Sequence, residues 1–96
     1  MINIDEYQRL AMETCSPINQ DIIQAILGLM DEVGELAKNI KGNRAQGHKL
    51  NMDNIREELG DTIWYVAMAC EVSGFRLSEV LEYNIEKLRR RFPSGF

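Results

Sequence analysis

The feature that most constrains this chain is a pair of short acidic rows, each inside an apolar stretch. Glu32 and Glu35 form the first row, and Glu58 and Asp61 form the second. Residues three apart on a helix lie on one face within reach of each other, so each row predicts a helix with two neighbouring carboxylates. The surrounding apolar residues also recur at helical spacing. The chain is therefore expected to be all-α.

Both rows border the side of the helix that should be buried. The apolar arc beside the first row contains Ile22, Ile26, Leu29, Val33, Leu36 and Ile40. Around the second row, apolar residues cover most of the helix, so no side of it is clearly solvent-exposed. Burying an uncompensated carboxylate costs several kcal/mol, and converging carboxylates raise one another's pKa. A divalent cation held by Glu32, Glu35, Glu58 and Asp61 would remove this conflict.

The kind of cation follows from the residues that are scarce. The one histidine, His48, lies outside both rows, and the two cysteines, Cys15 and Cys70, lack metal-site spacing. Zinc sites use nitrogen or sulfur ligands, and di-iron bundles use a Glu-x-x-His pattern. All-oxygen ligands favour Mg²⁺, with Mn²⁺ as the alternative. The cysteines are expected to be free, buried thiols.

Several segments resemble the MazG-like nucleotide pyrophosphohydrolases, an all-α group related to the dimeric dUTPases. The similar runs are residues 28–37, 57–65, 84–88 and 91–96. The family pattern, E-x-x-E followed after a variable gap by E-x-x-D, falls on the two acidic rows. The resemblance implies a four-helix bundle-like MazG fold assembled as an oligomer. It also implies Mg²⁺-dependent hydrolysis of nucleoside triphosphates to monophosphate and pyrophosphate, and a role in nucleotide-pool cleanup.

Length and composition fit one small domain over residues 1–96. A domain of this size buries only about 60 to 68% of its unfolded surface, yet 45% of the residues are hydrophobic. The helix from Asp53 to Ser73 is apolar nearly all round, which is typical of a helix covered on every side. A homo-oligomer, dimer or tetramer, that buries this helix between subunits is therefore expected.

Charge and hydropathy exclude some classes of partner. The net charge of −4 argues against a nucleic-acid-binding surface, which is usually basic. No segment approaches the roughly 20 apolar residues that span a bilayer, and the first residues lack the basic start of a secretory signal. A cytoplasmic location is expected.

Caps and breakers predict four helices. Their expected ranges are 3–14, 19–41, 53–73 and 78–92. Asn3, Asn19 and Ser78 are expected to cap the first, second and fourth helices. Gly42 and Gly74 are expected to end the second and third. Residues 42–52 then form a polar loop between the two acidic helices.

Some residues near the acidic rows have two open interpretations. Gly28 lies on the acid side of its helix, where it makes room either for metal or substrate or for a closely packed helix. Tyr65 shares a face with the second row, and Trp64 precedes it. Either ring can stack on a nucleobase, although aromatic residues at helical spacing more often belong to the core. Asp31 and Glu57 are two further acids beside these rows. Because of them, spacing alone does not decide which carboxylates bind the metal and which one acts as a base.

Candidate substrate-binding residues lie in the loop and in the last helix. The loop carries Arg44, His48 and Lys49, which either contact an anionic substrate or are solvated charges. In the last helix, Asn84, Lys87 and Arg91 interrupt an apolar face. The family's Asn-x-x-Lys pattern implies that Asn84 and Lys87 bind phosphate or sugar. The alternative for the cations is that they complement the helix dipole.

The rival function is a non-catalytic module that serves oligomerisation or binds nucleotide without cleaving it. In that case the acidic rows are surface or interface charges. No Ser/His/Asp or Cys/His arrangement for nucleophilic catalysis is evident in the sequence.

Overall fold

The computed structural model describes residues 1–46 and 49–96, with only the backbone described for residues 43–46. Its helices are α1 (Ile4–Met12), the short 3₁₀ turn η1 (Pro17–Asn19), α2 (Ile22–Gln46), α3 (Met52–Ser73) and α4 (Leu77–Arg91). The described part of the chain contains no β-strand. The prediction of an all-α fold is confirmed.

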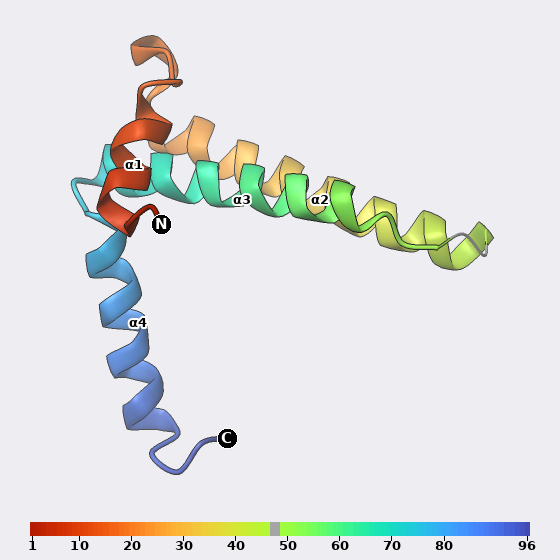
Figure 1. The fold of residues 1–96 in the computed structure, drawn as a ribbon. Helices are drawn as coiled ribbons and strands as arrows, with labels where there is room; N and C mark the ends of the chain where they lie inside the picture. Colours follow the sequence, from red (N-terminus) through yellow and green to blue (C-terminus); the bar gives the residue numbers. More distant parts are fainter. Residues whose placement is uncertain (47–48) are drawn as a thin grey trace.

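The helices form two arms that meet at α1. The long helices α2 and α3 lie side by side, and α1 crosses the end of the pair where α3 finishes (Figure 1). The last helix, α4, leaves this junction and extends away from the α2–α3 pair. Any residue in the lower half of α4 is therefore remote from the middle of that pair within one chain.

A small core lies where α1, α2 and α3 meet. Ala25 of α2 and Met68 of α3 are fully or almost fully buried, and Cys15 belongs to the same cluster, with its Sγ 3.5 Å from the Met68 Sδ. Cys15 and Cys70 are both free and buried, as expected. Small and flexible side chains at this point let the helices approach closely.

Two of the predicted helix signals are confirmed. The Asn3 side chain accepts a hydrogen bond from the Glu6 amide at 2.8 Å and so caps α1. Gly74 ends α3 in the left-handed conformation, with φ of 80°, which glycine adopts without the steric cost that other residues carry.

Two predicted caps are wrong. Asn19 lies in η1, and it is Asp21 that accepts from the Gln24 amide at the start of α2. Ser78 lies inside α4 and donates to Asp5 Oδ1 at 2.7 Å. The first turn of a helix needs acceptors for its free amides. At α2 the neighbouring Asp21 supplies one, and at α4 the acceptor comes from Gln8 of α1.

The predicted end of the second helix is also wrong. α2 continues through Gly42 to Gln46, so the loop between the acidic helices is shorter than expected. A single glycine inside a helix costs only about 1 kcal/mol relative to alanine. The arginine, alanine and glutamine that follow are good helix formers, and no proline interrupts them.

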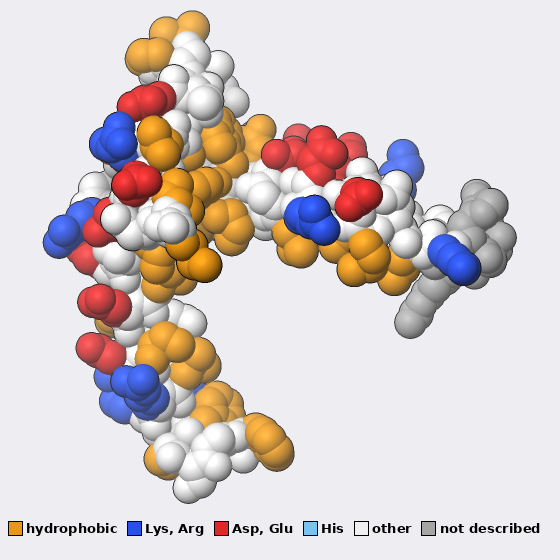
Figure 2. Space-filling view, in the orientation of Figure 1, with side chains coloured by type: hydrophobic (Ala, Val, Ile, Leu, Met, Phe, Trp, Pro, Cys, Tyr) orange, Lys and Arg blue, Asp and Glu red, His pale blue; other side chains and the backbone are white. Residues whose placement is uncertain are grey.

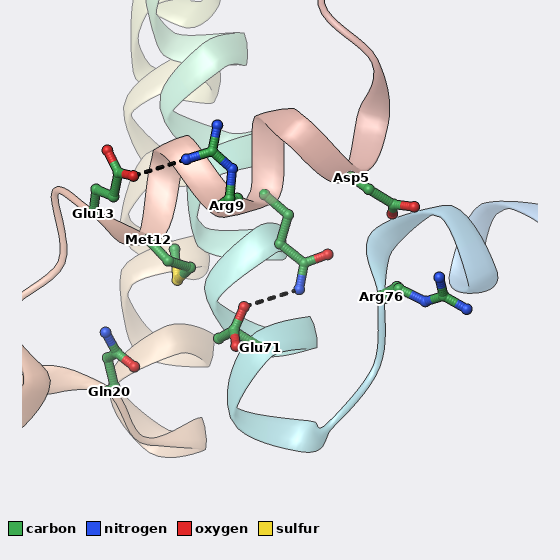
Figure 3. A pocket seen from close by; sticks show the side chains of 8 residues that line it. Asp5, Arg9, Met12, Glu13, Gln20, Glu71 and Arg76 are labelled. Atoms are coloured by element: carbon green, nitrogen blue, oxygen red, sulfur yellow. Dashed lines mark hydrogen bonds and ion pairs between the residues drawn. The ribbon is translucent and has the colours of Figure 1, made fainter.

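The buried side chain of Gln8 joins three helices at the junction. Its amide nitrogen donates to Glu71 Oε1 at 3.2 Å and to the Phe75 carbonyl at 3.0 Å. Its Oε1 accepts from the Leu77 amide at 2.6 Å, which caps α4 from α1. The neighbouring pocket has a volume of about 480 Å³ and is also lined by Arg76. Figure 3 shows Glu71 of α3 directed toward the side chains of α1 in this pocket.

Among the helices of the described part of the chain, none combines the length and the apolar character that crossing a membrane requires.

Candidate metal centre

The structure brings one residue of the first acidic row and both residues of the second together. Glu32 of α2 meets Glu58 and Asp61 of α3, and one carboxylate oxygen from each lies within 4.8 Å of the others. Glu32 and Glu58 are half-buried and Asp61 is exposed. Figure 2 shows acidic side chains gathered over the middle of the α2–α3 pair. The cluster is open to solvent on one side, so a substrate can reach it.

The electrostatics of this cluster favour an added positive charge. A hydrogen bond with Glu58 raises the pKa of Glu32 to about 7. Burial contributes next, followed by the negative charges of Glu58, Asp61 and Glu35. A hydrogen bond between two carboxylates needs a proton on one of them. At neutral pH the cluster therefore either holds a proton or binds a cation.

The environment of one Glu58 oxygen also favours an added positive charge. Its Oε2 is buried and has no hydrogen-bond partner among the described residues. A buried acceptor without a partner is costly, and a cation in the cluster would satisfy it. Three carboxylates form an all-oxygen donor set, which suits Mg²⁺ or Mn²⁺. The residues present thus fit the expected ion.

The remaining acids lie around this group. Glu35 is exposed and is not one of the three converging residues, although its charge contributes to the raised pKa of Glu32. Asp31 is exposed and faces a pocket beside Tyr65. Glu57 is exposed as well. Of the predicted set of four, Glu32, Glu58 and Asp61 therefore converge, and Glu35 lies near enough for its charge to act on Glu32.

A tyrosine of α1 belongs to this neighbourhood and was not predicted. Tyr7 is half-buried. Burial raises the pKa of Tyr7, and the negative charge of Asp61 raises it further. Its position on the apolar side of the first helix was readable from the sequence. That this side meets the acidic helices follows from the packing of α1 on α3, which no local pattern encodes.

Gly28 makes room for an aromatic ring. A Cβ at this position would lie 2.1 Å from Cε1 of Tyr65, so only glycine allows the ring to lie against α2. Tyr65 also packs edge-on against Trp64, with ring centroids 4.9 Å apart. Both rings contact the core and both line the pocket next to the acids. For Tyr65 and Trp64, core packing and stacking on a nucleobase are therefore compatible.

The predicted substrate-binding residues are dispersed. Asn84, Lys87 and Arg91 lie on α4, which extends away from the acid cluster (Figure 1). Glu58 and Asp61 lie about 18 to 22 Å from the end of α3, and Lys87 lies about 15 Å along α4. Within one chain these three residues do not join the cluster. His48 lies outside the described residues, and Lys49 is exposed.

Comparison with known proteins extends the resemblance to most of the chain. The family model of the MazG nucleotide pyrophosphohydrolase domain matches residues 20–96. The chain is also similar to the Gene 37 protein of Mycobacterium phage L5, with 30% identity over 106 aligned positions that cover 98% of this chain and 92% of that protein. No solved structure matches the chain.

Proposed function

Because this chain belongs to the MazG nucleotide pyrophosphohydrolase family, we propose that it hydrolyses nucleoside triphosphates to the monophosphate and pyrophosphate with the help of Mg²⁺. The observation that carries this proposal is the meeting of Glu32, Glu58 and Asp61 around the unpartnered oxygen of Glu58. A buried carboxylate oxygen without a partner calls for a specific explanation, and a bound cation provides one.

The proposed roles follow from the position of each carboxylate. Glu32, Glu58 and Asp61 hold the ion, and Glu35 joins them from the exposed edge. When bound, the ion supplies charge neutralisation at the phosphate oxygens and makes water a stronger nucleophile. One of these carboxylates also serves as the general base that takes a proton from the attacking water.

The chain is proposed to act as a homo-oligomer, because one copy leaves too much surface exposed. Its accessible surface is 7603 Å², whereas a compact monomer of this mass exposes about 5,600 Å². Its radius of gyration is 15.9 Å, against about 12 Å for a compact domain of this length. Apolar side chains line both arms on the sides that face the open angle between them (Figure 2).

A second copy would also explain the distant residues of α4. The apolar face of α4 is interrupted by Asn84, Lys87 and Arg91, and Lys87 is half-buried. The positive charges of Lys87 and Arg91 complement the acid cluster. We therefore expect these residues, and His48, to contact the phosphates of a substrate bound by the acids of another copy.

Pyrophosphate release from a panel of canonical and modified nucleotides tests the function. Wild-type protein should release pyrophosphate with Mg²⁺ or Mn²⁺ and should be inactive in EDTA. Asp61→Asn and Glu58→Gln should each lower kcat/KM by more than the roughly 10- to 100-fold loss that is typical of residues outside the metal's own ligands. Helicity measured by circular dichroism should not change.

Glu57→Gln is the matched control, since Glu57 precedes Glu58 but is exposed and outside the cluster. It should keep kcat/KM within a few-fold of wild type. Saturable nucleotide binding without pyrophosphate release from any substrate would instead favour a nucleotide-binding module.

A further inference from the structure

An apolar stripe runs along one side of α4. It consists of Leu81, Ile85, Leu88 and Phe92 and is called the α4 stripe below. At about 100° per residue, these four positions fall within about 60° of one another around the helix. Their alternating separations of four and three residues are those of the seam along which two helices pair. The stripe is therefore typical of a helix that packs against one other helix.

The α4 stripe is uncovered in a single chain. Leu81 is 43% exposed, Ile85 46%, Leu88 39% and Phe92 49%. α4 has 15 residues and extends away from its junction with α1 and α3 (Figure 1). A helix of this length is only marginally stable in water without tertiary packing. The far part of α4 therefore needs a partner that the described part of its own chain does not supply.

A hollow lies beside the stripe at the carboxyl end of α4. Its volume is about 420 Å³, and it is lined by Ile85, Leu88, Arg89, Phe92, Gly95 and Phe96. The chain turns at Gly95, which has φ of 86°, so the last residue lines the same space as residues of the helix. The hollow offers room and apolar surface for a large aliphatic side chain of a partner.

The charges of α4 are divided along its length. Acidic side chains come first and basic ones follow, a division visible on the face shown in Figure 2. The acids are Glu79, Glu82 and Glu86, and the bases are Lys87, Arg89, Arg90 and Arg91. Two such helices side by side attract each other when they run in opposite directions, whereas in parallel orientation acid meets acid and base meets base. The helix dipoles also favour the antiparallel orientation.

Two of these charges flank the stripe on the same side. Glu82 directly follows Leu81, and Arg89 directly follows Leu88. Side chains at such flanking positions form the ion pairs between paired helices. Among the described residues, neither Glu82 nor Arg89 belongs to an ion pair within the chain. Both are therefore free to pair with another molecule.

We propose that α4 pairs in antiparallel orientation with α4 of a second copy of this chain, with the two α4 stripes in contact and Glu82 of each copy beside Arg89 of the other. Lys87 lies outside this seam. The inference names an interface of the proposed homo-oligomer, and it does not depend on hydrolysis.

The register follows from matching the two stripes. Leu81 of one copy lies against Phe92 of the other and enters the hollow there, and Ile85 lies against Leu88. The twofold axis then passes between positions 86 and 87. This register places Glu82 within about one residue of the level of Arg89 of the second copy, so that each pair of helices contains two such ion pairs.

Charge reversal tests the ion pairs. Glu82→Arg and Arg89→Glu should each raise the dissociation constant of the oligomer about 10-fold at low salt, because each places like charges together twice across the axis. The double variant should return the constant to within a few-fold of wild type, since it only exchanges the two charges. Sedimentation equilibrium measures the constant. Both positions are exposed, so helicity measured by circular dichroism should not change.

Arg90→Glu is the matched control, since it makes the same change of charge on the side of α4 opposite the stripe. It should leave the dissociation constant unchanged. A double variant that associates no better than the single variants would overturn the inference.

Cross-linking tests the direction of pairing. Oxidation of a mixture of Leu81→Cys and Phe92→Cys proteins should give a disulfide-linked heterodimer, because these positions face each other. Leu81→Cys protein alone should not link to itself above the wild-type background, since its two copies lie about 16 Å apart along the pair, beyond the reach of a disulfide. The native cysteines are buried, and wild-type protein oxidised in the same way measures their contribution.

The other arrangements give different results. A disulfide between two copies of Leu81→Cys would show parallel pairing and overturn the inference. An oligomer that keeps its mass in both charge variants and forms no link between positions 81 and 92 would also overturn it, and would favour docking of the α4 stripe on α2 and α3 of the second copy. Hydrolysis is measured separately, so loss of the α4 pairing leaves the proposed activity standing, and absence of activity leaves the pairing standing.

Discussion

At the scale of single residues, spacing alone predicted which acids share a helix face but not which of them meet. Glu32, Glu58 and Asp61 converge, whereas Glu35 stays exposed at the edge. The difference arises because the relative rotation of α2 and α3 is fixed by packing, including the Tyr65 ring against Gly28. Spacing within one helix carries no information about that rotation.

The raised pKa of Glu32 predicts that Mg²⁺ binding depends on pH. Its pKa is raised from 4.5 to about 7, so a cation must displace a proton below neutrality. Mg²⁺ should therefore bind more weakly as pH falls below about 7, with release of up to one proton. Calorimetry in buffers of different ionisation enthalpy measures both quantities.

The raised pKa of Glu32 also determines whether stability rises or falls with pH. A carboxyl whose pKa is higher in the folded state stabilises the metal-free fold fully below pH 4.5, and this contribution is lost as pH rises through about 7. Added Mg²⁺ should therefore raise the Tm more at pH 8 than at pH 6. Glu32→Gln should remove most of this difference, and an unchanged difference would contradict the assignment.

At the scale of secondary-structure elements, periodicity predicted the four helices, and the errors lie at their ends. The start of α4 shows why. Its first amide, that of Leu77, bonds to the side chain of Gln8, 69 residues earlier in the chain. A cap supplied from another helix leaves no local signal, so Ser78 was the nearest and incorrect candidate.

Replacing Gln8 by leucine should destabilise the protein by about 2 to 3 kcal/mol, because the Phe75 carbonyl and the Leu77 amide would lose their buried partner. Chemical denaturation measures the change in the free energy of unfolding. Arg9→Ala is the control, since the Arg9–Glu13 ion pair is exposed and should contribute less than about 1 kcal/mol. Equal losses in both variants would argue against the role of Gln8.

At the scale of the whole molecule, composition predicted an apolar surface in excess of what one chain can bury. The extended shape, with α4 directed away from α2 and α3, could not be predicted in the same way. The direction of α4 depends on the short connection from Gly74 to Arg76 and on the bonds of Gln8. These are tertiary contacts that the helix pattern does not specify.

Sedimentation or light scattering should give a mass at least twice the 11.0 kDa of one chain. Leu88→Glu, which places a charge on the apolar face of α4, should shift the protein toward the monomer and reduce pyrophosphate release. Arg90→Glu changes charge on the other side of this helix and should leave the mass unchanged. A monomeric and fully active wild type would contradict the proposed assembly.

Mixing two inactive variants tests whether neighbouring copies share a site. Glu58→Gln and Lys87→Ala should each be impaired, and co-refolding them should restore part of the activity if Lys87 acts on the acids of another copy. No recovery in verified mixed oligomers would mean that Lys87 does not serve a neighbouring cluster.

The first helix has a consequence for how this molecule can diversify. α1 holds the indole of Trp64 and places Tyr7 near Asp61, yet it precedes the segment that matches the family, residues 20–96. Under the proposed function, exchange of this short leading segment would change the surroundings of Trp64 and Tyr7 and leave Glu32, Glu58 and Asp61 in place.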